Sequence, residues 1–399
     1  LSLDGSSNVR LECLELTDHS PCIVFYKPDP RFACNRQWGT DVGTWASTGL
    51  HAQDSGRVTL QDLNIHGLAS DGINAGRLHD WTVQRVVILA NGWSGWNGDL
   101  GGNDHSSSNS GKLVFDQLTV AWNGCGEKYP ASTIANCWGQ EEGGYGDGFG
   151  EAWTGGDWIF TRADIHDNTQ DGLDLLYNNG AGSTKVVQSR FHGNAGNQVK
   201  ISGPSSIINS IIVGNCMWTT QKADTTMLGA MQRSDDCRAM GNAVEVDFPL
   251  SSQLATLAFN TITGQGDGLV DASQTGKNNK VVLANNILDG RHSDKRGDEP
   301  TFGYYGGDDN KVPVDWIGNL VHGTRHGGCP GDSNCDDPML RDPAFANYDP
   351  VPELGSPVIA AASPKVSVET DFHGKRRPVH ASIGAVEYST AFDGTRLRP

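Results

Sequence analysis

Three aspartates and one lysine are spaced along this sequence at intervals that could bring their side chains together. Asp171 follows Asp147 at nearly the same interval at which Lys200 follows Asp174, and Asp174 lies close behind Asp171. Several carboxylates that converge on one point form the oxygen-rich site that Ca²⁺ prefers, and the cation relieves their mutual repulsion. A lysine beside a bound cation would have its pKa lowered and could act as a general base.

A repeated five-residue pattern predicts the element that would align these residues. Its first residue is usually polar and its third is nearly always apolar. Most copies follow one another at a nearly constant interval, and two steps are about twice as long. Such a period without a helical pattern is typical of a β-solenoid, in which equivalent positions stack about 4.8 Å apart. The copies occupy residues 48–52, 71–75, 94–98, 147–151, 171–175, 197–201, 242–246 and 267–271.

Apolar alternations between these copies predict further short strands that end in Gly- or Asn-containing corners. They span residues 58–65, 81–88, 158–165, 185–191, 207–213 and 280–287. We therefore expect one all-β domain over residues 1–388, with regular turns over about 46–290. Residues 291–388 are expected to form decorated end turns and a C-terminal capping segment, because a solenoid must cover its last apolar turn. Residues 389–399 would be a tail.

The strand alternation predicts which side chains face solvent. If the third residue of each copy points into the core, the fourth points outward. Asp147, Asp171 and Asp174 should then share one face with Lys200, and Gly150 should leave space in front of them. An alternative is that aspartate at the first position simply caps a turn. The fourth positions are His51, Asn74, Asn97, Gly150, Asp174, Lys200, Glu245 and Val270.

The nine cysteines form four close pairs and leave Cys13 over. Because no CxxC motif or histidine cluster accompanies them, we predict loop-closing disulfides rather than metal binding. Cys13 lies in an apolar run and is expected to be a buried thiol. Disulfides indicate a secreted or periplasmic protein. The predicted pairs are Cys22–Cys34, Cys125–Cys137, Cys216–Cys237 and Cys329–Cys335.

The charge balance excludes some partners. A net charge of −17 argues against binding to nucleic acid, which needs a basic surface. No apolar run is long enough for a membrane helix. The acidity also disfavours an anionic polymer as substrate unless a cation mediates its binding. Alternatively, the negative charge only keeps an exported protein soluble. The start of the sequence at Leu1 is what we expect of a processed, mature form.

The segment 144–204 resembles family 9 polysaccharide lyases, the pectate lyase group on a right-handed parallel β-helix. The resemblance rests on Gly146-Asp147-Gly148-Phe149 and on the segments 168–175 and 196–203. It implies that Asp147, Asp171 and Asp174 bind Ca²⁺ and that Lys200 is the catalytic base. The reaction would be β-elimination in a uronic-acid polysaccharide. Gln170 stands where the family has a further aspartate ligand.

Two other functions remain open. An inverting glycoside hydrolase needs two carboxyl groups about 6.5 to 9.5 Å apart, and Asp174, Glu245 or Glu151 could supply them. Residues 168–174 have some likeness to a phrase of polygalacturonase-type hydrolases, but the later phrases of that family are missing. A non-catalytic glycan-binding or adhesin β-helix is the third reading. Such stems are usually trimers with an apolar outer stripe, which this chain lacks, so we expect a monomer.

Other residues could contact a polysaccharide directly. Trp138 and Trp153 lie in Gly-rich loops and could stack on sugar rings, whereas Trp158 begins a strand and should pack in the core. Arg190 and Arg233 could bind a substrate carboxylate. Four histidines show no metal-ligand spacing and are expected to form hydrogen bonds at corners: His51, His66, His166 and His192.

Overall fold

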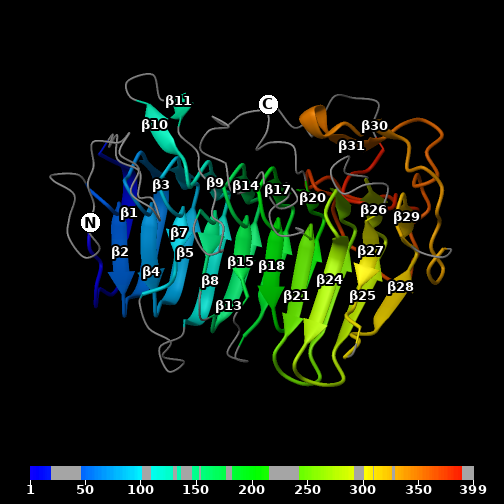
Figure 1. The fold of residues 1–399 in the computed structure, drawn as a ribbon, viewed down its shortest axis with the longest axis horizontal. Helices are drawn as coiled ribbons and strands as arrows, with labels where there is room; N and C mark the ends of the chain where they lie inside the picture. Colours follow the sequence, from blue (N-terminus) through cyan, green and yellow to red (C-terminus); the bar gives the residue numbers. More distant parts are fainter. Residues whose placement is uncertain are drawn as a thin grey trace.

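The computed structural model describes residues 1–18, 46–100, 109–128, 133–135, 146–151, 154–176, 182–214, 242–291, 301–308, 310–325 and 329–388. These residues form a right-handed parallel β-helix whose coils stack along the long axis of the molecule (Figure 1). A typical coil gives one strand to a nine-stranded sheet and two strands to an eighteen-stranded sheet. The predicted fold class is therefore confirmed.

The nine-stranded sheet is built from the repeated five-residue pattern. All its neighbouring strands are parallel, and Trp96 pairs directly with Phe149, so the long step between these two copies is one coil with an insertion. In order, the strands are β2 (Leu50–Gln53), β4 (Ile73–Gly76), β7 (Trp96–Asn97), β12 (Phe149–Gly150), β15 (Leu173–Leu175), β18 (Val199–Ser202), β21 (Val244–Phe248), β24 (Gly268–Gln274) and β27 (Phe302–Tyr305).

The eighteen-stranded sheet contains the other strands of the coils, and a single residue with positive φ separates them at several corners. Arg85 (φ 51°) and Arg162 (φ 53°) are two such corner residues. The strands are β1 (Arg10–Thr17), β3 (Gly56–His66), β5 (His79–Gln84), β6 (Val87–Leu89), β8 (Ser110–Asp116), β9 (Thr119–Ala121), β13 (Asp157–Thr161), β14 (Asp164–His166), β16 (Thr184–Val187), β17 (Arg190–His192), β19 (Ser205–Ile208), β20 (Ile211–Gly214), β22 (Leu254–Ala258), β23 (Thr261–Gly264), β25 (Lys280–Ala284), β26 (Ile287–Gly290), β28 (Val314–Ile317) and β29 (Leu320–His322).

The core is a continuous stack of apolar side chains inside the coils. The rings of Trp96 and Phe149 stack with centroids 4.9 Å apart, and Trp158 is buried as predicted. A ladder of asparagine amides runs along one corner, from Asn91 to Asn123 (3.0 Å) and from Asn123 to Asn168 (2.9 Å). Such ladders satisfy buried polar groups and fix the register between coils.

The cysteine predictions have mixed outcomes. The Cys329–Cys335 disulfide is confirmed, and Cys125 is disulfide-bonded. The prediction that Cys13 is buried is wrong: Cys13 is exposed, because it occupies a corner with φ 56° and its side chain turns outward. Five cysteines lie outside the described residues: Cys22, Cys34, Cys137, Cys216 and Cys237.

The C-terminal segment continues the stack and then packs along its side. Asn334 pairs with Leu320 of the last coil. Beyond it lie η3 (Phe345–Asn347) and a small antiparallel pair, β30 (Leu340–Asp342) and β31 (Asp349–Pro352). Residues of this segment share a buried cluster with Ile211 and Ile287, so the segment covers the flank of several coils.

Two smaller features complete the description. The strands β10 (Gly126–Lys128) and β11 (Thr133–Ala135) form an antiparallel hairpin. No helix in the described part of the chain is long and apolar enough to cross a membrane.

Candidate functional site

The outer face of the nine-stranded sheet carries a groove with a cavity of about 630 Å³. Parallel register places Asp174, Lys200 and Glu245 on successive strands β15, β18 and β21. Residues from adjacent coils thereby become neighbours, as predicted. We call this cavity the groove; the lining residues used below are Asp171, Asn197, Lys200, Glu245, Asp271, Phe302 and Tyr305.

The last predicted copy of the pattern is out of register by one residue. Val270 was expected to face outward, but it pairs with Val244 and is fully buried. Asp271 pairs with Glu245 instead, and so takes the outward position. An additional residue before the pairing position, Leu269, is also buried, so both apolar side chains enter the core. The groove therefore gains a carboxylate that the sequence pattern did not predict.

Lys200 forms the centre of the predicted cluster. Its Nζ lies 3.2 Å from Asp174 Oδ2 and 3.5 Å from Asp171 Oδ2. Asp171 is 2 % exposed and Asp147 is 7 % exposed. A Cβ on Gly150 would lie 3.0 Å from Asp147 Oδ2, so glycine leaves room for this carboxylate. Asp147, Asp171, Asp174 and Lys200 therefore lie on neighbouring coils, with Lys200 in contact with Asp171 and Asp174, and Asp147 beside Asp171.

Two aspartates at the first position of the pattern accept hydrogen bonds from the backbone of the next coil. Asp147 Oδ1 accepts a hydrogen bond from the backbone N–H of Asp171 (3.0 Å). Asp171 Oδ1 accepts one from the N–H of Asn197 (2.6 Å). One oxygen of each carboxylate thus links successive coils and does not cap its own turn. The other oxygen of Asp171 faces Lys200, so this residue both joins two coils and belongs to the charged cluster.

Burial and mutual repulsion shift the carboxyl groups of this cluster. Burial, reinforced by Asp171 and Asp174, raises the pKa of Asp147 well above its usual range. Burial and the charge of Asp171 likewise raise the pKa of Asp174 to about 7. Burial alone would lower the pKa of Lys200, but Asp171 and Asp174 reverse this and raise it. The protein groups alone therefore hold Lys200 protonated, so the predicted lowered pKa is not a property of these side chains by themselves.

The structure separates Arg190 from the groove. Arg190 lies on β17 in the eighteen-stranded sheet, and its guanidinium carbon is 5.7 Å from the centroid of the Phe372 ring. Arg190 therefore lies on the other sheet and does not line this groove, and its contact with a substrate carboxylate stays a prediction. Arg233, Trp138 and Trp153 lie outside the described residues.

Gln170, the predicted neutral ligand, is buried and immediately precedes Asp171 in the sequence. Its side-chain oxygen Oε1 has no hydrogen-bond partner among the described residues. An orphaned amide oxygen of this kind is costly unless a donor or a cation reaches it.

Aromatic side chains line one end of the groove. Phe302 and Tyr305 come from β27, within a segment that the sequence reading treated only as decorated end turns. The aromatic run Phe302-Gly303-Tyr304-Tyr305 could have indicated a strand, but strict alternation would not have placed Phe302 and Tyr305 on the same face. Aromatic rings in a polar groove suit contacts with sugar rings.

The chain has only weak similarity to known proteins. No family model and no curated protein matches the chain. A crystal structure of pectate lyase Pel9A aligns with a TM-score of 0.46 and 15% identity, covering 86% of this chain and 74% of that one. A structure of XylC in complex with xylose aligns with a TM-score of 0.43 and 11% identity, covering 89% and 67%. These similarities are too low to support an argument about function.

Asp271 makes stability depend on pH. Burial, with a smaller contribution from Glu245, raises the pKa of Asp271 from 3.8 to about 7. The folded state therefore binds this proton more tightly than the unfolded chain, and its stabilising effect is lost as pH rises from about 4 to about 7. We expect Asp271→Asn to be more stable than the wild type at about pH 8, and to lose this advantage at about pH 4.

Urea unfolding at both pH values measures the difference. The matched control is Asp336→Asn, which removes an exposed carboxylate. Equal effects of Asp271→Asn at the two pH values would contradict the raised pKa.

Proposed function

We propose that the protein is a calcium-dependent lyase that cleaves a uronic-acid polysaccharide by β-elimination. The supporting observation is the position of Lys200, whose ammonium lies within 3.5 Å of two aspartates from the preceding coil, in an open groove. The residues that resemble family 9 polysaccharide lyases are these same residues. We further propose a secreted or periplasmic monomer, since the chain carries disulfides.

The side chains of the cluster suit Ca²⁺. Ca²⁺ takes six to eight oxygen ligands at about 2.3–2.6 Å. Asp147, Asp171 and Asp174 offer carboxylate oxygens, and Gln170 offers a buried amide oxygen without a hydrogen-bond partner among the described residues. Burial and, second, the negative charge of neighbouring aspartates raise the pKa values of Asp147 and Asp174, and a bound cation would favour their ionised forms. Bound there, Ca²⁺ would neutralise the uronate carboxylate and acidify the proton on C5.

The chain's own residues then perform the proton transfer and hold the substrate. Lys200 reaches into the groove from β18. With the charges of Asp171 and Asp174 offset, it would release its own proton to water and, as the neutral amine, take the C5 proton. The C4–O bond then breaks, the electron pair leaves with the glycosidic oxygen, and a C4–C5 double bond forms. Phe302 and Tyr305 supply flat surfaces for neighbouring sugar rings.

Product chemistry tests the proposal. The protein is incubated with pectate, alginate and glycosaminoglycans, with Ca²⁺ or with excess chelator. We expect the ultraviolet absorbance of the unsaturated product to rise with one of these polymers, and to stop rising when the chelator is added. An increase of absorbance that the chelator leaves unchanged would remove calcium from the proposal.

A hydrolase is the second candidate, and Asp271 is the observation that favours it. Asp271 and Glu245 lie on adjacent strands, and the raised pKa of Asp271 is what a general acid needs. Asp174 and Glu245 are separated by two strand spacings, about 9.6 Å, near the upper limit for an inverting pair. New reducing ends without a gain in ultraviolet absorbance would identify this reaction.

A further inference from the structure

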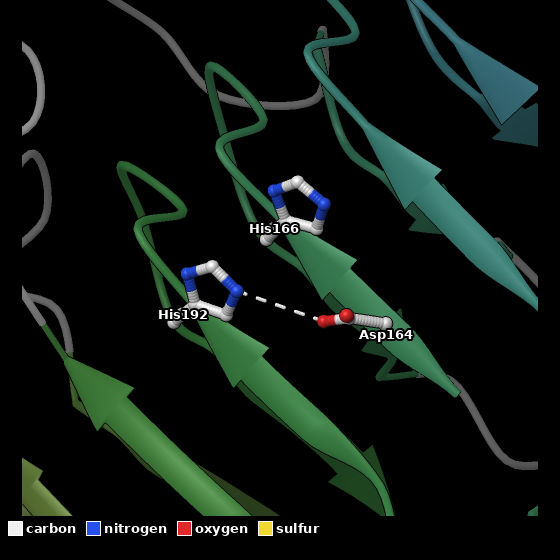
Figure 2. Close-up of side chains that lie close together, drawn as sticks. All are labelled: Asp164, His166 and His192. Atoms are coloured by element: carbon white, nitrogen blue, oxygen red, sulfur yellow. Dashed lines mark ion pairs between the residues drawn. The ribbon is translucent and has the colours of Figure 1, made fainter. Parts of the chain in front are cut away.

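A second group of metal-ligating side chains lies on the eighteen-stranded sheet. Asp164 and His166 come from β14 and His192 from the next strand, β17, where it pairs with His166. One candidate ligand atom from each lies within 4.8 Å of the other two. The close-up in Figure 2 shows both imidazoles extending from the same side of neighbouring strands, with Asp164 beside His192. Among the described residues, this is the group with that geometry; the aspartates of the groove do not form one.

The two imidazole rings are held in a defined orientation. Their centroids are 4.7 Å apart and their planes differ by 3°. His166 Nδ1 lies 2.9 Å from Asp167 Oδ2. Because an ionised carboxylate can only accept, Nδ1 carries the proton, and the lone pair is on Nε2. A carboxylate that orients a histidine in this way is the usual outer partner of a metal-ligating imidazole.

Asp164 forms a long ion pair with His192 but no hydrogen bond that satisfies its Oδ1. Its Oδ1 is buried, has no hydrogen-bond partner among the described residues, and lies 3.6 Å from His192 Nε2. This distance is too long for a good hydrogen bond. Two atoms that bind one tetrahedral ion at about 2.1 Å are about 3.4 Å apart, so the gap suits a shared metal.

Arg190 does not satisfy Asp164 either. Arg190 is its direct neighbour across the strands, yet no ion pair joins these two described residues. The guanidinium of Arg190 lies over Phe372 instead. Asp164 therefore keeps an acceptor that is directed toward the imidazoles.

We propose that Asp164, His166 and His192 bind one divalent transition-metal ion of the Zn²⁺ type. Two imidazole nitrogens and one carboxylate favour Zn²⁺, Cu²⁺ or Ni²⁺, whereas Ca²⁺ prefers oxygen alone. The ion joins two successive coils and leaves one coordination position for water. Asp164 also lines a cavity of about 340 Å³ against the C-terminal segment. This proposal is independent of the proposed function, because it uses no residue of the groove.

Titration calorimetry tests the site. The full chain, without a histidine tag, is stripped with chelator and titrated with ZnCl₂ in excess CaCl₂. We expect one Zn²⁺ per chain and a higher midpoint of thermal unfolding when it is bound. His166→Ala and His192→Ala should each abolish this binding. His380→Ala, which removes an exposed histidine, should leave it unchanged.

A variant that keeps all three ligands separates weaker metal binding from a failure to fold. Asp167→Asn keeps all three ligands and should weaken Zn²⁺ binding about 10- to 100-fold. Co²⁺ bound to the wild type should give the visible absorption of a tetrahedral site. The proposal is overturned if the wild type binds no Zn²⁺ at one per chain, or if folded His166→Ala and His192→Ala variants bind it as tightly as the wild type.

Discussion

Replacing Lys200 by methionine is expected to abolish cleavage of the polysaccharide. If Lys200 takes the C5 proton, its loss should lower kcat by about 10²- to 10⁴-fold, the usual contribution of a positioned general base. KM should change much less, because the lysine contributes mainly in the transition state. Initial rates on the polymer identified by product chemistry measure both quantities.

A matched lysine provides the control for this experiment. Lys280 on β25 also pairs with an aspartate, Asp315, at 2.6 Å, but in the other sheet. Lys280→Met should therefore retain wild-type kcat. Lys200→Met with near-wild-type kcat would show that the elimination does not use this lysine, and it would favour the carboxylate pair of a hydrolase.

Replacing Arg377 by methionine is expected to destabilise the protein by about 3 to 5 kcal/mol, because it removes a buried guanidinium with several hydrogen bonds and takes the cation away from the partly buried carboxylate of Glu387. Arg377 is 8 % exposed and donates to Glu387 Oε1 at 2.6 Å. It also donates to Asn209 Oδ1 at 2.9 Å, and its guanidinium carbon lies 4.4 Å from the centroid of the Phe259 ring. This one side chain thus ties the C-terminal segment to two coils.

Denaturant unfolding measures the effect on the free energy of unfolding. The control is Arg376→Met, which removes an adjacent but exposed arginine and should stay within about 0.5 kcal/mol of the wild type. If the two variants lose equal stability, the interactions of Arg377 do not hold the segment in place.

Much of the fold could be predicted from the sequence because one short pattern sets the register of the nine-stranded sheet. Phe149, Leu173 and Val199 pair as consecutive inward residues, as their positions in the pattern require. The prediction fails where packing can accept an additional residue: Leu269 and Val270 are both buried, and this moves Asp271 outward. Periodicity alone does not distinguish these two registers.

Only part of the candidate site could be predicted from the sequence, because the pattern aligns only the residues that belong to it. Asp174 and Lys200 are separated by one coil within the pattern, so their proximity followed from it. His166 and His192 are also one coil apart. This separation is much longer than the local spacing of common metal-binding motifs, so the spacing of the histidines did not indicate a shared site. The sequence did not reveal which sheet carries Arg190, because the alternation of a short strand does not identify its sheet.

The two long steps of the repeat have a consequence for how this groove could diversify. The additional residues enter the chain just before β12 and just before β21, beside strands that carry or flank the Asp174–Lys200 pair. Pairing of Trp96 with Phe149 and of Val199 with Val244 continues across both entry points without a shift. The sheet that holds Asp174 and Lys200 therefore does not depend on the length of these inserts, and segments of other lengths are compatible with the same strand pairing.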